Sequence, residues 1–100
     1  MSWVREALEA IEQGRVAKVR PYGGSMRGRI ESGQLVTIVP AGAADVAPGD
    51  AVFVRWKGGY LLHLIVEHGG DRVLIGNNIG RVNGWAPASA VLGRVVAVEP

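Results

Sequence analysis

The spacing of apolar residues changes at Gly14, from a helical period before it to the short runs typical of strands after it. Four apolar residues of the first segment recur at intervals of three and four: Val4, Ala7, Leu8 and Ile11. This spacing places them on one face of a helix, which Ser2 can cap and Gly14 can end. A helix this short must dock on something to persist. We expect a packing element or a lid, with a helix that recruits a partner as the alternative.

After Gly14, apolar runs bounded by turn residues predict a mainly β chain. The runs place strands at 15–20, 35–40, 51–56, 60–67, 72–75 and 91–98. The run LVTIVP at 35–40 is apolar on both faces, which favours a central strand. Lys57-Gly58-Gly59 predicts a hairpin connection. The segment 76–87 is rich in Gly, Asn and Pro, and it predicts a loop.

The length of 100 residues supports one domain, in which we expect a helix over 1–14 and a β domain over 15–100. Hydrophobic residues make up 48% of the chain and charged residues 20%, a balance that favours an ordered globular fold. The fifteen glycines suit a sheet that bends sharply and often.

The net charge and the distribution of basic residues favour nucleic-acid binding only weakly. The net charge is +2, and the densest group of basic residues lies between Arg15 and Arg29. Nucleic-acid binding usually needs a concentrated basic face, and no helix-turn-helix, zinc-finger or RNP-like pattern accompanies this stretch. We expect a solvated strand face there, and nucleic-acid binding is the least favoured of three functional hypotheses.

The sequence contains no cysteine, which excludes disulfides, thiolate metal ligands and cysteine nucleophiles. Its two histidines, His63 and His68, lack the spacing to carboxylates that a metal site would need, so we expect neither a metal nor a cofactor. The first fifteen residues include five charged side chains, unlike a targeting segment. No apolar run approaches the roughly 20 residues that cross a bilayer. We therefore expect a cytoplasmic protein without a membrane anchor.

Two side chains are candidates for chemistry. Gly23-Gly24-Ser25 is either an ordinary turn or a bend that presents the Ser25 hydroxyl as a nucleophile. A histidine in mid-strand, as His63 is in LLHLIV, is partly desolvated, which favours the neutral imidazole that a general base needs. The alternative is a core or edge histidine that only hydrogen-bonds a backbone carbonyl. A serine hydroxyl needs a base to become nucleophilic, and only folding can bring these two residues together.

The order of motifs over residues 20–98 resembles the LexA/signal-peptidase clan of serine peptidases. GGSM, followed by an apolar strand ending in Pro40, is similar to the nucleophile segment of that clan. The turn Pro48-Gly49-Asp50 and the strand YLLHLIVE then stand where the clan has a turn and its general-base strand. Further matches follow in order towards the end of the chain: Gly76-Asn77-Asn78, Arg81, Gly84-Trp85-Ala86-Pro87 and Gly93-Arg94-Val95.

This resemblance implies coiled, strongly bent β-sheets with one N-terminal helix. It implies Ser25 as nucleophile and His63 as general base, similar to the signal peptidases that use a Ser-His pair instead of the more common lysine. Backbone N–H groups of Gly24, Ser25 and Met26 would hold the oxyanion. Asn77, Asn78 and Asn83 are candidates to orient His63, because the aspartate of the Ser-His type is absent. Asn77, Asn78 and Arg81 are the supporting residues that match the motif.

Two departures from the clan lie beside the serine. Gly23 replaces a residue whose hydroxyl helps to hold the oxyanion in bacterial signal peptidases, and Gly28 replaces a common proline. The leading hypothesis is a serine endopeptidase whose extended peptide substrate pairs with an exposed strand edge and has small side chains near the cut. The alternative is a catalytically impaired relative that binds peptides or proteins. Self-association into a homodimer stays open.

Overall fold

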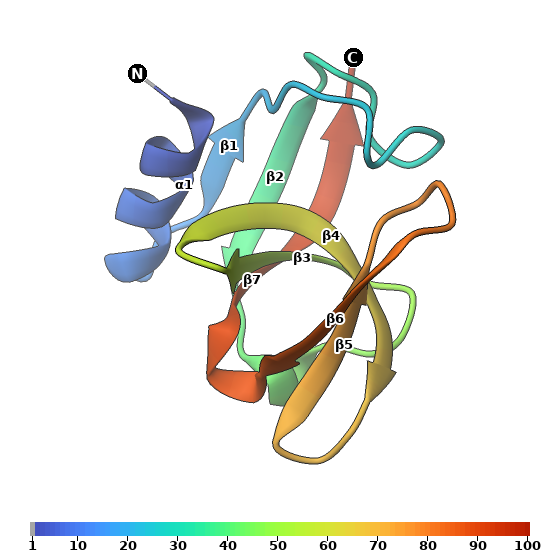
Figure 1. Cartoon of the computed structure of the whole chain (residues 1–100). Helices are drawn as coiled ribbons and strands as arrows, with labels where there is room; N and C mark the ends of the chain where they lie inside the picture. The colour runs from blue at the N-terminus through green and yellow to red at the C-terminus, as the bar shows by residue number, and fades with distance from the viewer. Residues whose placement is uncertain (1) are drawn as a thin grey trace.

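The chain forms one short α-helix followed by strands of a single sheet, in a computed structural model that describes residues 2–100 (Figure 1). The elements are α1 (Trp3–Glu12), β1 (Ala17–Val19), β2 (Leu35–Pro40), the 3-10 helix η1 (Ala43–Asp45), β3 (Ala51–Trp56), β4 (Gly59–His68), β5 (Arg72–Gly76), β6 (Val82–Pro87), the 3-10 helix η2 (Ala88–Ala90) and β7 (Val91–Glu99). The strands pair antiparallel in the order β1-β2-β7-β3-β4-β5-β6. The expected mainly β class with an N-terminal helix is confirmed.

Helix α1 is held at both ends and along one face. Ser2 Oγ accepts a hydrogen bond of 3.2 Å from the Arg5 backbone N–H, which caps the helix start. Gly14, with φ of 71°, ends the helix in the left-handed region that glycine adopts without strain. Ala7 and Ala10 are buried where α1 packs beside β1 and β2. The helix is therefore a packing element of the core, and its inward face includes Trp3 as well as the residues that the spacing predicted.

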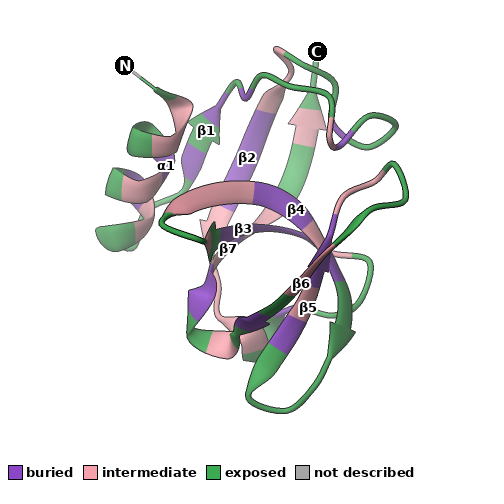
Figure 2. Ribbon diagram, viewed as in Figure 1, coloured by how far each residue is buried: buried purple, intermediate pink, exposed green. Residues whose placement is uncertain are grey.

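The sheet bends because its long strands change partners along their length. The first part of β4 pairs with β3 and its second part with β5, while β7 pairs with β3 at its start and with β2 beyond. Four ladders contain register shifts, and such irregularities bend and twist strands. The core accordingly divides into two clusters, with Phe53 of β3 in one and Val52 and Val54 in the other. Figure 2 shows these buried positions along β2, β3 and the middle of β4.

Most strand predictions are confirmed, and one loop prediction is wrong. Strand β2 has neighbours on both sides, although it lies second from the edge of the sheet. The segment 76–87, expected as a loop, contains strand β6 at Val82–Pro87. An edge strand has only one partner and tolerates Gly and Pro. Gly84, with φ of 143°, also fits here because a Cβ would lie 3.1 Å from the Trp56 ring.

Replacing Gly93 with alanine should destabilise the fold. A Cβ at Gly93 would lie 2.7 Å from Ile38 Cγ2 and 3.0 Å from the Val39 carbonyl oxygen, so the packing of β2 on β7 must shift. Overpacking of this kind costs about 1–3 kcal/mol in the free energy of unfolding, which urea denaturation measures. Gly59→Ala is the matched control, because its Cβ would meet only the Trp56 carbonyl oxygen at 3.7 Å. Equal urea midpoints for the two variants would contradict the close approach at Gly93.

Candidate active site

Ser25 lies in the long loop between β1 and β2, and two buried side chains fix this loop to the core. Met26 and Ile30 are each 5% exposed and belong to the same cluster as Phe53. The backbone N–H groups of Arg29 and Ile30 donate to the Met26 carbonyl oxygen, which closes a tight turn after the serine. The side chain next to Ser25 is thus anchored, while Ser25 itself stays half-buried.

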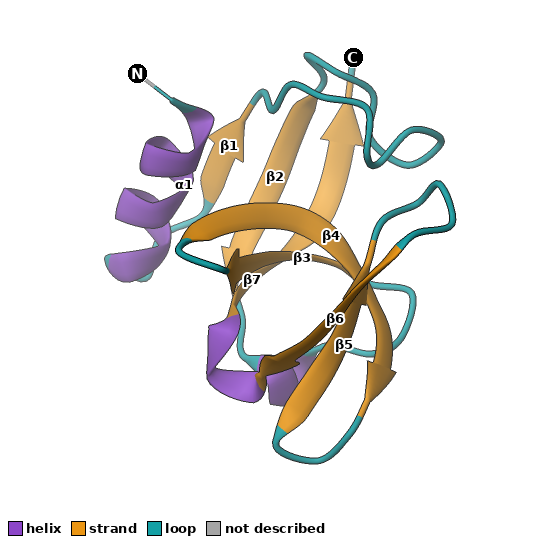
Figure 3. Cartoon of the chain, in the orientation of Figure 1, coloured by secondary structure: helices purple, strands orange, loops and turns teal. Residues whose placement is uncertain are grey.

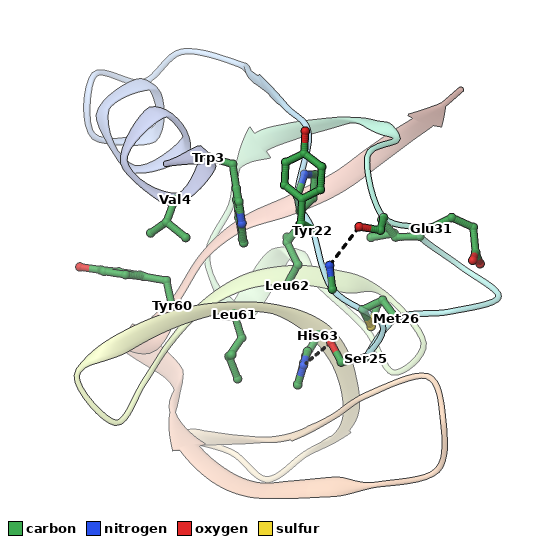
Figure 4. A pocket seen from close by; sticks show the side chains of 14 residues that line it. Trp3, Val4, Tyr22, Ser25, Met26, Glu31, Tyr60, Leu61, Leu62 and His63 are labelled. Carbon is green, nitrogen blue, oxygen red and sulfur yellow. Dashed lines mark hydrogen bonds between the residues drawn. The ribbon is translucent and has the colours of Figure 1, made fainter. Parts of the chain in front are cut away.

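His63 lies in β4 and contacts both Ser25 and Asn83. Its Nε2 atom is 3.1 Å from Ser25 Oγ, and its Nδ1 atom is 2.8 Å from Asn83 Oδ1 (Figure 4 shows the Ser25 contact). An amide oxygen only accepts hydrogen bonds, so Nδ1 of neutral His63 carries the proton and Nε2 accepts from the serine hydroxyl. His63 is 6% exposed. The arrangement holds the tautomer that a general base for Ser25 requires.

The loop between β5 and β6 is hydrogen-bonded to the loop that carries Ser25, and the two loops approach each other in Figure 3. Asn78 donates from its backbone N–H to the Ser25 carbonyl oxygen at 3.0 Å. Its side-chain Nδ2 donates to the Arg27 carbonyl oxygen at 2.7 Å. These bonds fix the serine backbone to the opposite loop, which reduces the freedom of Oγ relative to the imidazole.

Of the three asparagines considered, Asn83 is the one that contacts His63. Asn77 instead shapes its own loop, because its Oδ1 accepts from the backbone N–H groups of Ile79 and Arg81 at 3.0 and 2.9 Å. Asn78 joins the two loops, and the hydrogen bonds of Arg81 are made by its backbone. Asn83 lies on β6, which the sequence predicted as a loop. Without the strand and its register, the direction of the Asn83 side chain could not be predicted.

The backbone conformation of Gly28 is one that proline cannot adopt. Its φ is 91°, whereas the proline ring fixes φ near about −65°. A Cβ at this position would also lie 2.9 Å from Asn78 Nδ2, which bonds the Arg27 carbonyl oxygen. A glycine at this position therefore suits the close contact between the two loops.

Backbone N–H groups without an acceptor in the described part of the protein lie next to the serine. Within residues 2–100, no protein group accepts a hydrogen bond from the backbone N–H of Gly24, Ser25 or Met26. The neighbouring N–H of Gly23 is engaged with Ser32 Oγ at 3.2 Å. Unengaged amides beside a nucleophile can stabilise the negative oxygen of a tetrahedral intermediate.

A cavity of about 300 Å³ opens beside the Ser25–His63 pair (Figure 4). Its apolar floor includes Met26, Ile30 and Leu62, all buried. Strand β4 borders it with an unpaired edge, because β5 pairs with β4 only from Leu64 to His68. The stretch 59–63 therefore has a strand partner on one side only among the described residues, and an extended chain can pair with the other side.

No protein-family model matches the chain, and no curated protein matches its sequence. Within residues 2–100, no group of three or more His, Cys, Asp or Glu side chains is placed to hold a metal ion. In the same range, no helix has the length and apolar character needed to cross a membrane.

Removing the amide of Asn83 should cost more stability than removing the hydroxyl of Ser25. Asn83→Ala leaves the buried N–H of His63 without its acceptor, a loss of about 1–3 kcal/mol in the free energy of unfolding. Ser25→Ala removes a half-buried hydroxyl that water can replace, so its effect should be smaller. Urea denaturation compares the two variants, and an Asn83→Ala variant as stable as Ser25→Ala would contradict the hydrogen bond to His63.

Proposed function

We propose that the chain is a serine endopeptidase of the LexA/signal-peptidase clan, with Ser25 as nucleophile and His63 as general base. The observation that carries the proposal is the continuous hydrogen-bonded series of Ser25, His63 and Asn83, with contacts of 3.1 and 2.8 Å. A nucleophile in contact with a base that a third group orients is the arrangement that activates a hydroxyl. The ordered clan motifs support the same assignment.

The proposed reaction follows from this geometry. His63 Nε2 takes the proton of Ser25 as Oγ bonds to the carbonyl carbon of a peptide, and the carbonyl oxygen becomes an oxyanion. Backbone N–H groups at Gly24, Ser25 or Met26 stabilise that charge. His63 then returns the proton to the leaving amine as the C–N bond breaks. Water activated by the same imidazole hydrolyses the acyl-enzyme and restores Ser25.

The unpaired edge of β4 supports an extended peptide as substrate. A peptide paired with residues 59–63 would run along the cavity and bring a carbonyl group towards Ser25. Backbone hydrogen bonds to the strand supply binding that does not depend on the peptide sequence, while the cavity contacts its side chains.

A peptide-binding module without efficient catalysis is the second candidate. The observation that favours it is the neutral side chain of Asn83 where a Ser-His peptidase has a carboxylate. The amide fixes the imidazole tautomer but does not supply the negative charge that stabilises an imidazolium. The same edge of β4 would then bind a peptide without cutting it.

The positions of the basic side chains argue against the third hypothesis, nucleic-acid binding. Arg20 Nη1 donates to the Gly33 carbonyl oxygen and Arg29 Nη1 to the Gly49 carbonyl oxygen, each at 2.9 Å. Arg15 donates to the side chain of Gln13. Three of the five basic side chains between Arg15 and Arg29 therefore bond with the protein's own loops and helix end, which leaves fewer of them to form a row of phosphate-binding groups.

A fluorophosphonate probe, which captures activated serines, should label Ser25. We expect His63→Ala to slow labelling by about 100-fold or more, because the general base is lost. Mass spectrometry of the labelled peptide identifies the serine, and the rate is followed by fluorescence.

Ser89→Ala is the matched control, because Ser89 is an exposed serine in η2. It should be labelled at the rate of the unmodified protein, while Ser25→Ala should take up no probe. Labelling that is equally fast in His63→Ala would exclude the proposed base. Absence of labelling, together with binding of peptides, would favour the binding module.

A further inference from the structure

The open edge of β4 ends at a turn whose backbone N–H groups are free. Residues 59–63 lack a strand partner on one side among the described residues, and the last of them contacts the Ser25 side chain. The Arg27 N–H donates to the Gly24 carbonyl oxygen at 3.3 Å, which closes the turn. The N–H groups of Gly24, Ser25 and Met26 come before that bond and have no acceptor within residues 2–100.

The side chain of Arg27 lies over the same turn. Its Nε and Cδ atoms are 3.7 Å from the position of a Cβ on Gly24, so the side chain folds back across the glycine. The backbone of Arg27 is also held, because its carbonyl oxygen accepts from Asn78 Nδ2 at 2.7 Å. In the described part of the chain the guanidinium hydrogen-bonds no protein group, unlike the side chains of Arg20 and Arg29. A cation without an internal partner therefore stands beside three free donors.

These groups together suit a carboxylate. An ionised carboxylate only accepts hydrogen bonds, and it has two oxygens that several donors can share. Successive backbone N–H groups of a turn, with a cation beside them, are an arrangement by which proteins capture the C-terminal carboxylate of a peptide. Glu31 is the acidic residue that lines the cavity, and its Oε2 atom accepts from the Gly28 N–H at 2.7 Å. Its charge is thus engaged by a donor other than the three free ones.

The free donors also favour one direction of a bound peptide. A peptide on the edge of β4 with its carboxyl end at Ser25 runs parallel to the strand, from the Tyr60 end of the cavity to the turn (Figure 4). The opposite direction would bring an amino end towards N–H groups and a guanidinium, which repel a positive charge. Pairing with the strand permits both directions, and the free donors select the one that ends in a carboxylate.

We propose that the turn of residues 24–27 is a carboxylate site, which binds the free C-terminal carboxylate of an extended peptide paired with residues 59–63. Its three free N–H groups donate to the carboxylate oxygens, and the Arg27 guanidinium supplies the opposite charge. The inference rests on the proposed function in one respect, that a peptide pairs with β4, and it requires no cleavage. It gives the chain a further class of ligand, which is a polypeptide that ends at the site.

The test is an NMR titration of Ser25→Ala, which cannot cut the peptides. In the unmodified protein the Ser25 hydroxyl donates to His63, so its removal takes no donor from the carboxylate. Three acetylated hexapeptides of alternating threonine and alanine are compared: the free acid, the C-terminal carboxamide, and a carboxamide with aspartate at its third residue. The free acid should bind about tenfold tighter than either carboxamide, because only its chain end forms charge-assisted hydrogen bonds with the turn.

The same spectra locate the bound carboxylate. The backbone amide protons of Gly24, residue 25 and Met26 should move further downfield with the free acid than with the carboxamides, since a hydrogen bond to an anion deshields the proton. A turn that only supports the fold would give the same shifts with all three peptides.

Substitutions of Arg27 in this background test the cation. Arg27→Gln should reduce the preference for the free acid about threefold, as expected for an exposed charge pair, and Arg27→Lys should keep most of the preference. Arg5→Gln is the matched control, because Arg5 is an exposed arginine on α1 that does not line the cavity. It removes the same charge from another part of the surface.

The outcomes distinguish this inference from the proposed function. Equal affinity for the free acid and either carboxamide, or equal effects of Arg27→Gln and Arg5→Gln, overturns the carboxylate site even if fluorophosphonate labels Ser25. Failure of all three peptides to bind overturns it as well. If the free acid binds with the expected preference while fluorophosphonate does not label Ser25, the carboxylate site holds and catalysis is what fails.

Discussion

The change of partners along β4 is the constraint on which the candidate site depends. Up to His63 this strand pairs with β3 alone, Leu64 pairs with both β3 and β5, and beyond Leu64 the strand pairs with β5. The imidazole therefore lies at the residue where one edge of the strand ceases to be open. On the open side the Ser25 loop and helix α1 enclose a cavity, and on the paired side β6 brings Asn83 to the far nitrogen of the ring.

The polar groups at this point form a connected set rather than isolated pairs. Asn83 fixes the tautomer of His63, His63 contacts Ser25, and Asn78 fixes the Ser25 backbone to the loop that precedes β6. The Ser25 loop is therefore held by hydrogen bonds to the loop that connects β5 and β6. A buried network of this kind lowers stability when any of its polar groups lacks a hydrogen-bond partner, and it makes the site rigid when every group has one. Because Asn83 is a neutral amide, it orients the imidazole of His63 without supplying a negative charge beside it. The reactivity of Ser25 is therefore the quantity to measure.

Helix α1 links the stability of the fold to the shape of the pocket. Its small residues, Ala7 and Ala10, allow close approach to β1 and β2, and its first turn reaches the cavity through Trp3. Because Phe53 contacts both Trp3 and Tyr60, one core residue supports two walls of the cavity. A domain of this size has a modest core. Using the same aromatic group for packing and for the pocket is consistent with that limit.

The sequence by itself determined the helix, most strands, the mainly β class and the two candidate side chains, since period and turn residues act locally. Ser25 in its glycine bend and His63 in an apolar strand could be recognised because each carries a local pattern. The contact between them, the choice of Asn83 over Asn77 and Asn78, strand β6 and the pocket wall from Trp3 were decided only by tertiary structure. Each depends on register between segments distant in the chain, and a shift of one residue reverses which side chains face the site.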